Sequence, residues 1–188
     1  MDEPKRINES ENPWETLSSE VVYSNPWIEI SHRNVINPSG GKGIYGVVSF
    51  KNLAIGVVPV DDSLNTYLVG QYRYTLNQYS WEIPEGGGPQ NEEPLETAKR
   101  ELQEETGLTA EKWSLLGSIH TSNSVTDEFG HIFLAMDLKQ TEAEPEETEE
   151  LAVKKLPLKE AITMVERGEI TDSLSIAGLL LAGRKLGV

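Results

Sequence analysis

Residues 86–108 read GGGPQNEEPLETAKRELQEETGL, three glycines followed by a charged segment that ends in clustered glutamates. Within this segment Leu95, Ala98 and Leu102 recur three and four residues apart, the spacing of an apolar stripe that faces a core from one side of a helix. Gly107 supplies a C-terminal stop for that helix. The stretch therefore predicts a glycine loop that leads into an amphipathic helix.

Three glutamates of this helix fall on one face, beside the apolar stripe. Each residue advances about 100° around a helix axis, which brings Glu101, Glu104 and Glu105 together. Like charges at helical spacing cost roughly 0.2–0.5 kcal/mol per pair, and anions in the last turn are disfavoured by about 0.3–1 kcal/mol. A hard cation such as Mg²⁺ would offset this repulsion by coordination. The alternative is a solvated acidic face that Lys99 and Arg100 partly neutralise.

The order and spacing of the charged residues decide between these alternatives. The pattern is Gly86, five residues, Glu92, seven residues, Arg100-Glu101-Leu102, one residue, Glu104-Glu105, one residue, and Gly107-Leu108. This pattern resembles the signature of the Nudix hydrolases at every defined position. The resemblance implies an α/β fold, an α/β/α sandwich with a mixed sheet and a metal-binding loop-helix-loop. It also implies hydrolysis of a nucleoside diphosphate linked to another moiety.

The resemblance implies a set of metal ligands. Glu101 and Glu105 match the principal ligands, and Glu104 matches a further ligand that binds directly or through water. The backbone carbonyl of Glu85, just before the first glycine, would be an additional metal contact. The expected cofactor is Mg²⁺, and Mn²⁺ is expected to substitute for it.

Other signature positions would orient the ligands or admit the substrate. The resemblance implies that Arg100 and Glu92 orient the metal-binding glutamates. The glycines at 86–88 have a rationale of their own, because a residue without Cβ lets backbone approach a metal-bound diphosphate closely. Gly87, the middle one, is therefore a candidate substrate contact.

A catalytic base is expected outside the signature, because the attacking water must be deprotonated or held in line with the phosphorus. The loop at 121–129 carries two adjacent carboxylates, Asp127 and Glu128. It resembles the segment that holds the general-base glutamate in ADP-ribose pyrophosphatases, where Glu128 is the matching residue. Asp127 is the competing candidate, and both could simply solvate a turn. The loop has Ser122-Asn123-Ser124 where those enzymes usually carry a proline.

Residues before the signature resemble the nucleoside-diphosphosugar branch of the family. In that branch Arg73 would pair with a substrate phosphate, for which its planar guanidinium is suited, and its alternative is a surface ion pair. Glu82 would bind the terminal sugar or position the loop. Trp27 and Tyr45 occupy positions where relatives stack the nucleobase, although an aromatic residue in a strand more often packs in a core.

The rest of the chain predicts one domain over residues 19–188, with a β-hairpin at 19–50. In the resembling enzymes this hairpin crosses to a partner subunit, which implies a homodimer. Residues 1–18 are polar and read as an extension, neither signal peptide nor membrane span. The glutamate-rich run at 142–150 predicts a solvated loop, with a contribution to the site as the alternative.

Alternating apolar residues and turn signals also predict the elements around the signature. Strands are expected at 53–60 and 66–69 before it and at 113–120 and 131–138 after it, and two helices are expected at 158–166 and 171–185.

Composition excludes several function classes. The formal charge of −15 disfavours a nucleic-acid partner, and the absence of cysteine excludes a disulfide framework and a thiolate site. A cytoplasmic location is expected. The sequence thus predicts a Mg²⁺-dependent pyrophosphatase that acts on a small nucleotide sugar, ADP-ribose first and GDP-mannose-like sugars next. The alternatives are hydrolysis of dinucleoside polyphosphates, nucleoside triphosphates or capped RNA, and a non-catalytic module that senses a nucleotide.

Overall fold

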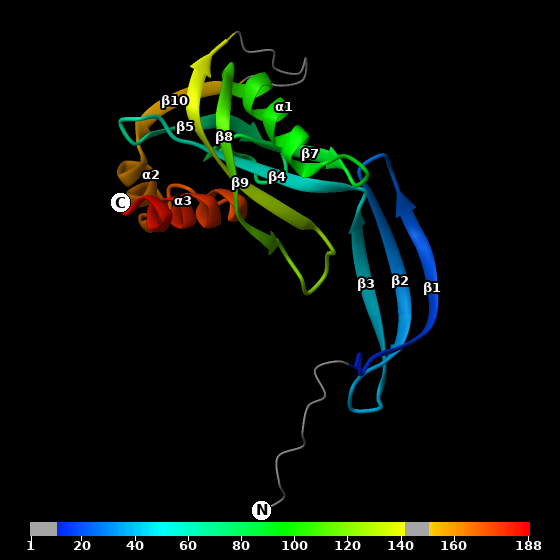
Figure 1. Cartoon of the computed structure of the whole chain (residues 1–188). Helices are drawn as coiled ribbons and strands as arrows, with labels where there is room; N and C mark the ends of the chain where they lie inside the picture. The colour runs from blue at the N-terminus through cyan, green and yellow to red at the C-terminus, as the bar shows by residue number, and fades with distance from the viewer. Residues whose placement is uncertain (1–10, 142–150) are drawn as a thin grey trace, which may run out of the picture. The chain divides into compact units, whose positions relative to one another are not determined.

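The structure is a computed structural model that describes residues 11–141 and 151–188. The chain divides into two compact units. The first contains the described residues up to Lys51 together with Ser124–Asp127, and the second contains the other described residues from Asn52 onward. Figure 1 labels the elements in chain order.

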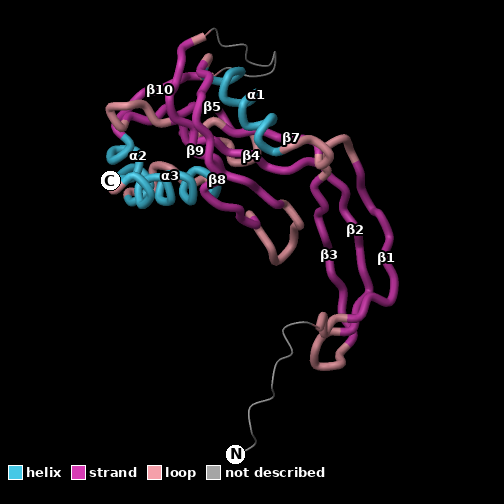
Figure 2. Tube along the Cα trace, viewed as in Figure 1, coloured by secondary structure: helices cyan, strands magenta, loops and turns pink. Residues whose placement is uncertain are grey.

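The first unit is a three-stranded antiparallel sheet in the order β1-β2-β3 (Figure 2). Its strands are β1 (Glu15–Ser24), β2 (Ile28–Ile36) and β3 (Lys42–Phe50). The turn between β2 and β3 is held by Asn37, whose side-chain oxygen accepts hydrogen bonds from the backbone N–H groups of Ser39 and Gly41.

The sheet begins earlier than the sequence predicted. The expected extension at 1–18 overlaps β1, which starts at Glu15, and the expected hairpin at 19–50 is a three-stranded sheet. Every residue of β1 is exposed, so no alternation of buried and exposed residues marks this strand. Polar contacts hold it instead, as where the amide of Asn34 donates to the hydroxyl of Ser18. A strand held by ladder bonds and polar pairs carries little periodic signal in the sequence.

The second unit contains two sheets. A four-stranded mixed sheet has the order β7-β4-β9-β8, in which β4 and β9 are parallel, and a three-stranded antiparallel sheet has the order β10-β5-β6. The strands are β4 (Asn52–Pro59), β5 (Asn65–Arg73), β6 (Gln78–Glu82), β7 (Glu85–Pro89), β8 (Leu108–His120), β9 (Phe129–Gln140) and β10 (Ala152–Pro157).

Helices cover both faces of the mixed sheet (Figure 1). On one face α1 (Pro94–Thr106) packs Ala98 and Leu102 against Ile55 and Val57 of β4. On the other face α3 (Ser173–Leu186) packs against the neighbouring β4 residue Val58 and against β9, while α2 (Leu158–Glu166) packs against α3 and against β5 and β10 of the second sheet. This alternation along β4 produces three layers. The predicted α/β sandwich with a mixed sheet is confirmed.

The signature helix forms as the spacing predicts. Pro94 occupies its first turn, where no N–H is needed, and Gly107 ends it in the left-handed conformation with φ of 67°. The N–H of Gly107 donates to the carbonyl of Gln103 at 2.8 Å. Near the C-terminus α2 spans the predicted residues, and Asp172 caps α3 by accepting from the N–H of Ser175 at 2.7 Å.

The glycine run differs from the prediction of a loop, because Glu85–Pro89 forms β7, which pairs with β4. Glycine usually weakens a strand, but here it lets the strand lie directly against α1. Among the described residues, no helix is long and apolar enough to cross a membrane. The acidic run at 142–150 lies outside the described residues.

Candidate active site

The glycines of β7 set the distance between the strand and α1. A Cβ added to Gly86 would lie 2.2 Å from the carboxyl carbon of Glu101, and one added to Gly88 would lie 2.3 Å from the hydroxyl oxygen of Thr97. Both separations are shorter than any van der Waals contact, so side chains of α1 fill the space that other residues would need. The carboxylate of Glu101 therefore rests directly on the backbone of β7.

Two of the three clustered glutamates are buried beside this backbone. Glu101 and Glu105 are 8% and 4% exposed, respectively. The carboxylate of Glu105 accepts a hydrogen bond from the N–H of Glu85 at 2.9 Å. Glu104 is more open, with 30% of its side chain exposed. The structure thus brings Glu101 and Glu105 to the same strand that carries the Glu85 carbonyl.

Arg100 links two of these glutamates. Its Nη2 lies 2.7 Å from Glu101 Oε1, and its Nη1 lies 2.7 Å from Glu104 Oε2. Nη2 also donates to the carbonyl of Gly87 at 3.3 Å. Burial alone would lower the pKa of the Arg100 guanidinium. The carboxylates of Glu101 and Glu104 have the larger combined effect and raise this pKa. These contacts fit the predicted orienting role.

Glu92 makes a different contact from the one expected. Its carboxylate accepts from the hydroxyl of Thr97 at 2.9 Å, in the first turn of α1. Thr97 in turn fills the space left by Gly88. Glu92 therefore holds Thr97 in the first turn of α1, at the point where the helix packs against β7.

The donor set fits a hard divalent cation. Glu101, Glu104, Glu105 and the Glu85 carbonyl offer only oxygen, which Mg²⁺ and Mn²⁺ prefer. Within residues 11–141 and 151–188, no three acidic or imidazole side chains already converge as ligands of one ion. One oxygen of each of the three carboxylates has a donor nearby, Arg100 for Glu101 and Glu104 and the N–H of Glu85 for Glu105. A cation would take over positions that these donors now satisfy.

A second group of charges surrounds Arg73. Its Nε lies 3.0 Å from both carboxylate oxygens of Glu82, and its Nη2 lies 2.9 Å from Glu85 Oε1. Burial alone would lower the pKa of Arg73, but the nearby carboxylates of Glu82, Glu85 and Asp172 raise this pKa above its usual value. Arg73 thus forms ion pairs that are partly buried, with 34% of its side chain exposed.

Glu85 is the least satisfied member of this group. Its Oε2 is buried and has no hydrogen-bond partner among the described residues. Burial raises the pKa of this carboxyl well above its usual value, the charges of Asp172 and Glu82 raise it further, and Arg73 opposes them. Asp172 is also the N-cap of α3. Nothing in the local sequence indicates that it also faces a residue 87 positions earlier.

The loop after β8 separates the two candidate bases. The hydroxyl of Thr121 donates to the carboxylate of Glu128. Asp127 instead accepts from the backbone N–H of Phe50 through Oδ1 at 2.8 Å. Each carboxylate therefore has a distinct partner, one a hydroxyl and the other the backbone of β3.

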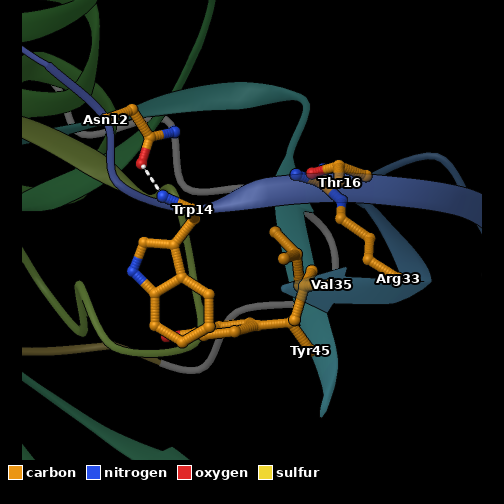
Figure 3. Close-up of a pocket in the computed structure, with 7 residues that line it drawn as sticks. Asn12, Trp14, Thr16, Arg33, Val35 and Tyr45 are labelled. Carbon is orange, nitrogen blue, oxygen red and sulfur yellow. Dashed lines mark hydrogen bonds between the residues drawn. The ribbon is translucent and has the colours of Figure 1, made fainter. Parts of the chain in front are cut away.

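An aromatic pocket of about 240 Å³ lies on the sheet of the first unit (Figure 3). Trp14 and Tyr45 meet edge to face across it, with ring centroids 5.5 Å apart. Trp27, by contrast, is 66% exposed and does not line it. Trp14 was missed because it falls within the stretch expected to be an extension. The pocket is lined by Asn12, Trp14, Thr16, Arg33, Val35, Tyr45 and Val47.

Comparisons with known proteins match this architecture. Residues 51–175 match the NUDIX domain, and residues 14–48 match the nucleoside diphosphate sugar hydrolase N-terminal domain. The ADP-ribose pyrophosphatase of Mycobacterium tuberculosis is 36% identical, over 91% of this chain and 84% of the relative. The ADP-ribose pyrophosphatase of Bacillus subtilis is 34% identical, over 84% of this chain and 86% of the relative.

A solved structure shows the same fold. The crystal structure of an ADP compounds hydrolase superposes with a TM-score of 0.84 at 22% identity, covering 96% of this chain and 97% of that one. With the family match over most of the chain and the glutamates of α1 packed on the glycines of β7, the chain belongs to the Nudix hydrolase family.

Proposed function

We propose that this Nudix hydrolase cleaves the diphosphate linkage of a nucleoside diphosphosugar, with Mg²⁺ as its metal. ADP-ribose is the first candidate and GDP-mannose-like sugars are the next, and the products are a nucleoside monophosphate and a sugar phosphate. The observation that carries the proposal is the contact between α1 and β7, which buries Glu101 and Glu105 against strand backbone. The names of the two relatives and of the N-terminal family support the choice of substrate.

In this mechanism Glu101, Glu105 and Glu104, with the carbonyl of Glu85, hold the metal. A bound divalent cation would neutralise the diphosphate and polarise the scissile P–O bond. Arg100 sets the orientation of Glu101 and Glu104 through its two short ion pairs.

Glu128 supplies the general base. Its carboxylate accepts a proton from the attacking water while the water oxygen bonds to phosphorus. The P–O bond then breaks, and the departing phosphate keeps the bonding electrons. The hydroxyl of Thr121, which donates to Glu128, holds the carboxylate in place.

Three further residues have proposed roles at the substrate. Arg73 binds a phosphate through its exposed third, while Glu82 and Glu85 hold the rest of the guanidinium. Glu82 then positions the strand before the glycines, and it is 4% exposed. For the nucleobase, the pocket favours Tyr45 over Trp27 as the stacking platform.

The partners of this proposal are a small nucleotide sugar and a second copy of the chain. The charge of −15 disfavours nucleic acid, and it also means that an anionic substrate depends on a cation for screening. A homodimer and a cytoplasmic location stay predictions.

Product analysis tests the proposed function. The purified protein with Mg²⁺ is incubated with ADP-ribose, GDP-mannose, UDP-glucose, a diadenosine polyphosphate and nucleoside triphosphates. We expect ADP-ribose to give AMP and ribose phosphate fastest, and Glu105→Gln to lose this activity. Faster cleavage of triphosphates than of every diphosphosugar would refute the substrate assignment. Tight binding without any product would indicate a sensing module.

A matched amide variant tests the base. Glu128→Gln keeps the shape of the side chain and removes its basicity, so kcat should fall by roughly 10²–10⁴. An unchanged kcat would remove Glu128 from this role.

A further inference from the structure

A short segment of the loop at 121–129, which carries Glu128, is attached to the N-terminal sheet β1-β2-β3. Ser124–Asp127 belongs to the first unit although it lies between β8 and β9 in the chain. The N–H of Val48 donates to the carbonyl of Val125 at 2.9 Å, and the N–H of Asp127 donates to the carbonyl of Val48 at 3.2 Å. Val48 and Thr126 thus form a parallel bridge. The segment thus pairs with the edge of β3 at a single bridge.

This attachment uses the edge of β3 that β2 leaves open. β3 is at the end of the order β1-β2-β3, so alternate N–H and carbonyl groups point away from the sheet. Val48 and Phe50 are such residues, and the loop satisfies both. An edge that would otherwise be unpaired becomes the support of the loop.

Side chains fix the segment at both ends. At one end the hydroxyl of Tyr45 donates to the carbonyl of Ser124 at 2.6 Å. At the other end the carboxylate of Asp127 accepts from the N–H of Phe50 at 2.8 Å. Four hydrogen bonds with β3 therefore hold three of the four residues of the segment, Ser124, Val125 and Asp127.

We propose that Asp127 is the anchor of this loop and a positioning residue for Glu128, rather than a second base. Asp127 directs its carboxylate at the backbone of β3, whereas Glu128, one peptide bond later, has its carboxylate on Thr121. Because Glu128 directly follows Asp127 in the chain, fixing Asp127 restricts the positions that the backbone of Glu128 can adopt. The inference rests on the proposed role of Glu128 in catalysis.

Substitution by asparagine distinguishes an anchor from a base. Asparagine keeps a side-chain oxygen that can accept from Phe50 N–H but cannot take a proton from water. Asp127→Asn should therefore stay within about twofold of the wild-type kcat, whereas Asp127→Ala, which lacks the acceptor, should lose about tenfold with little change in KM. Glu128→Gln should lose far more than Asp127→Asn. Equal losses in Asp127→Asn and Glu128→Gln would overturn the proposal.

Amide hydrogen exchange tests the anchor without catalysis. The Phe50 amide should exchange slowly in the wild type and in Asp127→Asn, and faster in Asp127→Ala. Asp62→Ala, at an exposed aspartate of the second unit, is the control and should leave this amide protected. If Phe50 exchanges at the same rate in Asp127→Ala and in the wild type, the anchor is wrong whatever the activity. If the wild type cleaves nothing in the panel, the proposed function fails while the exchange result still stands.

Discussion

Gly86 is the residue on which the position of Glu101, a proposed metal ligand, depends most directly. An alanine there would place its Cβ 2.2 Å from the Glu101 carboxyl carbon, with Glu101 already buried between strand and helix. Either the carboxylate or the helix must then move. A displacement of about 1 Å in a catalytic group can cost about 100-fold in rate, and overpacking costs about 1–3 kcal/mol of stability. Gly86→Ala should therefore lower kcat/KM for ADP-ribose about 100-fold and lower Tm.

Gly46→Ala is the matched control for this prediction. A Cβ at Gly46 meets nothing within 4 Å, so the same chemical change adds no clash. Its activity and Tm should stay close to those of the wild type. Wild-type activity in Gly86→Ala would show that the carboxylate of Glu101 has room to move, contrary to the close packing described above.

At the scale of single residues, the sequence predicts what a fixed spacing determines and misses what the fold brings together. The glutamates and Arg100 share one helix, so the contact between Arg100 and Glu104, four residues later, follows from helical geometry. Asp172 faces Glu85 and Asp127 binds Phe50 only because distant segments meet. Local pattern cannot encode such pairs, and Trp14 was missed for a related reason, because it lies directly before a fully exposed strand that has no burial pattern.

Among the elements, α1 depends on a left-handed residue at its end. Gly107 has φ of 67°, and its carbonyl also accepts from the N–H and the hydroxyl of Thr141. A side chain in this conformation costs about 1–2 kcal/mol, although asparagine tolerates it better. Gly107→Ala should lower the free energy of unfolding by about that amount, and Gly107→Asn should lower it less. Urea unfolding measures both, and equal losses would show that conformation at residue 107 is not the cause.

Asp61, in the turn between β4 and β5, is expected to make the free energy of unfolding depend on pH. Burial would raise the pKa of Asp61, but contacts from Lys155, Asn65 and Ser63 outweigh it and hold the pKa well below its usual value. A depressed pKa stabilises the fold above the unfolded pKa of about 3.9, and this contribution is lost as pH falls through the folded pKa.

Asp61→Asn should therefore lower the free energy of unfolding by about 1 kcal/mol at pH 7, and by less at pH 3.5. Urea unfolding at the two pH values measures this, with Asp62→Asn at the exposed neighbouring residue as the control. A loss that stays constant across this range would exclude the carboxylate charge as its source.

Elements were predictable where burial imposes a period. The stripe of α1 has such a period, and β4 is marked instead by a continuous apolar run that is buried on both faces; both form close to the predicted residues. β7 consists largely of glycine, and β10 is half exposed and lies next to residues outside the description. Neither sequence alternates apolar and polar residues along its length. The two segments are strands because β7 pairs with β4 and β10 pairs with β5. Pairing is a tertiary property, which propensity does not report.

At the scale of the whole molecule, the feature to be explained is the exposed apolar surface of the N-terminal sheet. Large apolar side chains there are more than half exposed, among them Val22 at 58%, Trp27 at 66% and Ile44 at 70%. Exposed apolar area of this kind marks an interaction surface, and a three-stranded sheet needs a covered apolar face to be stable. A second copy of the chain is the partner that we propose.

Light scattering coupled to size exclusion tests this assembly. The wild type should elute with twice the chain mass of 20.9 kDa. Val22→Glu with Ile44→Glu places charge on the exposed sheet and should shift the protein toward the monomer at micromolar concentration. Leu115→Glu with Val153→Glu adds the same charge at two exposed apolar residues of the second unit and should leave the dimer intact. Both variants make the net charge of −15 more negative by the same amount, so dissociation in both would indicate general charge repulsion. Dissociation in the first variant alone would place the interface on the sheet.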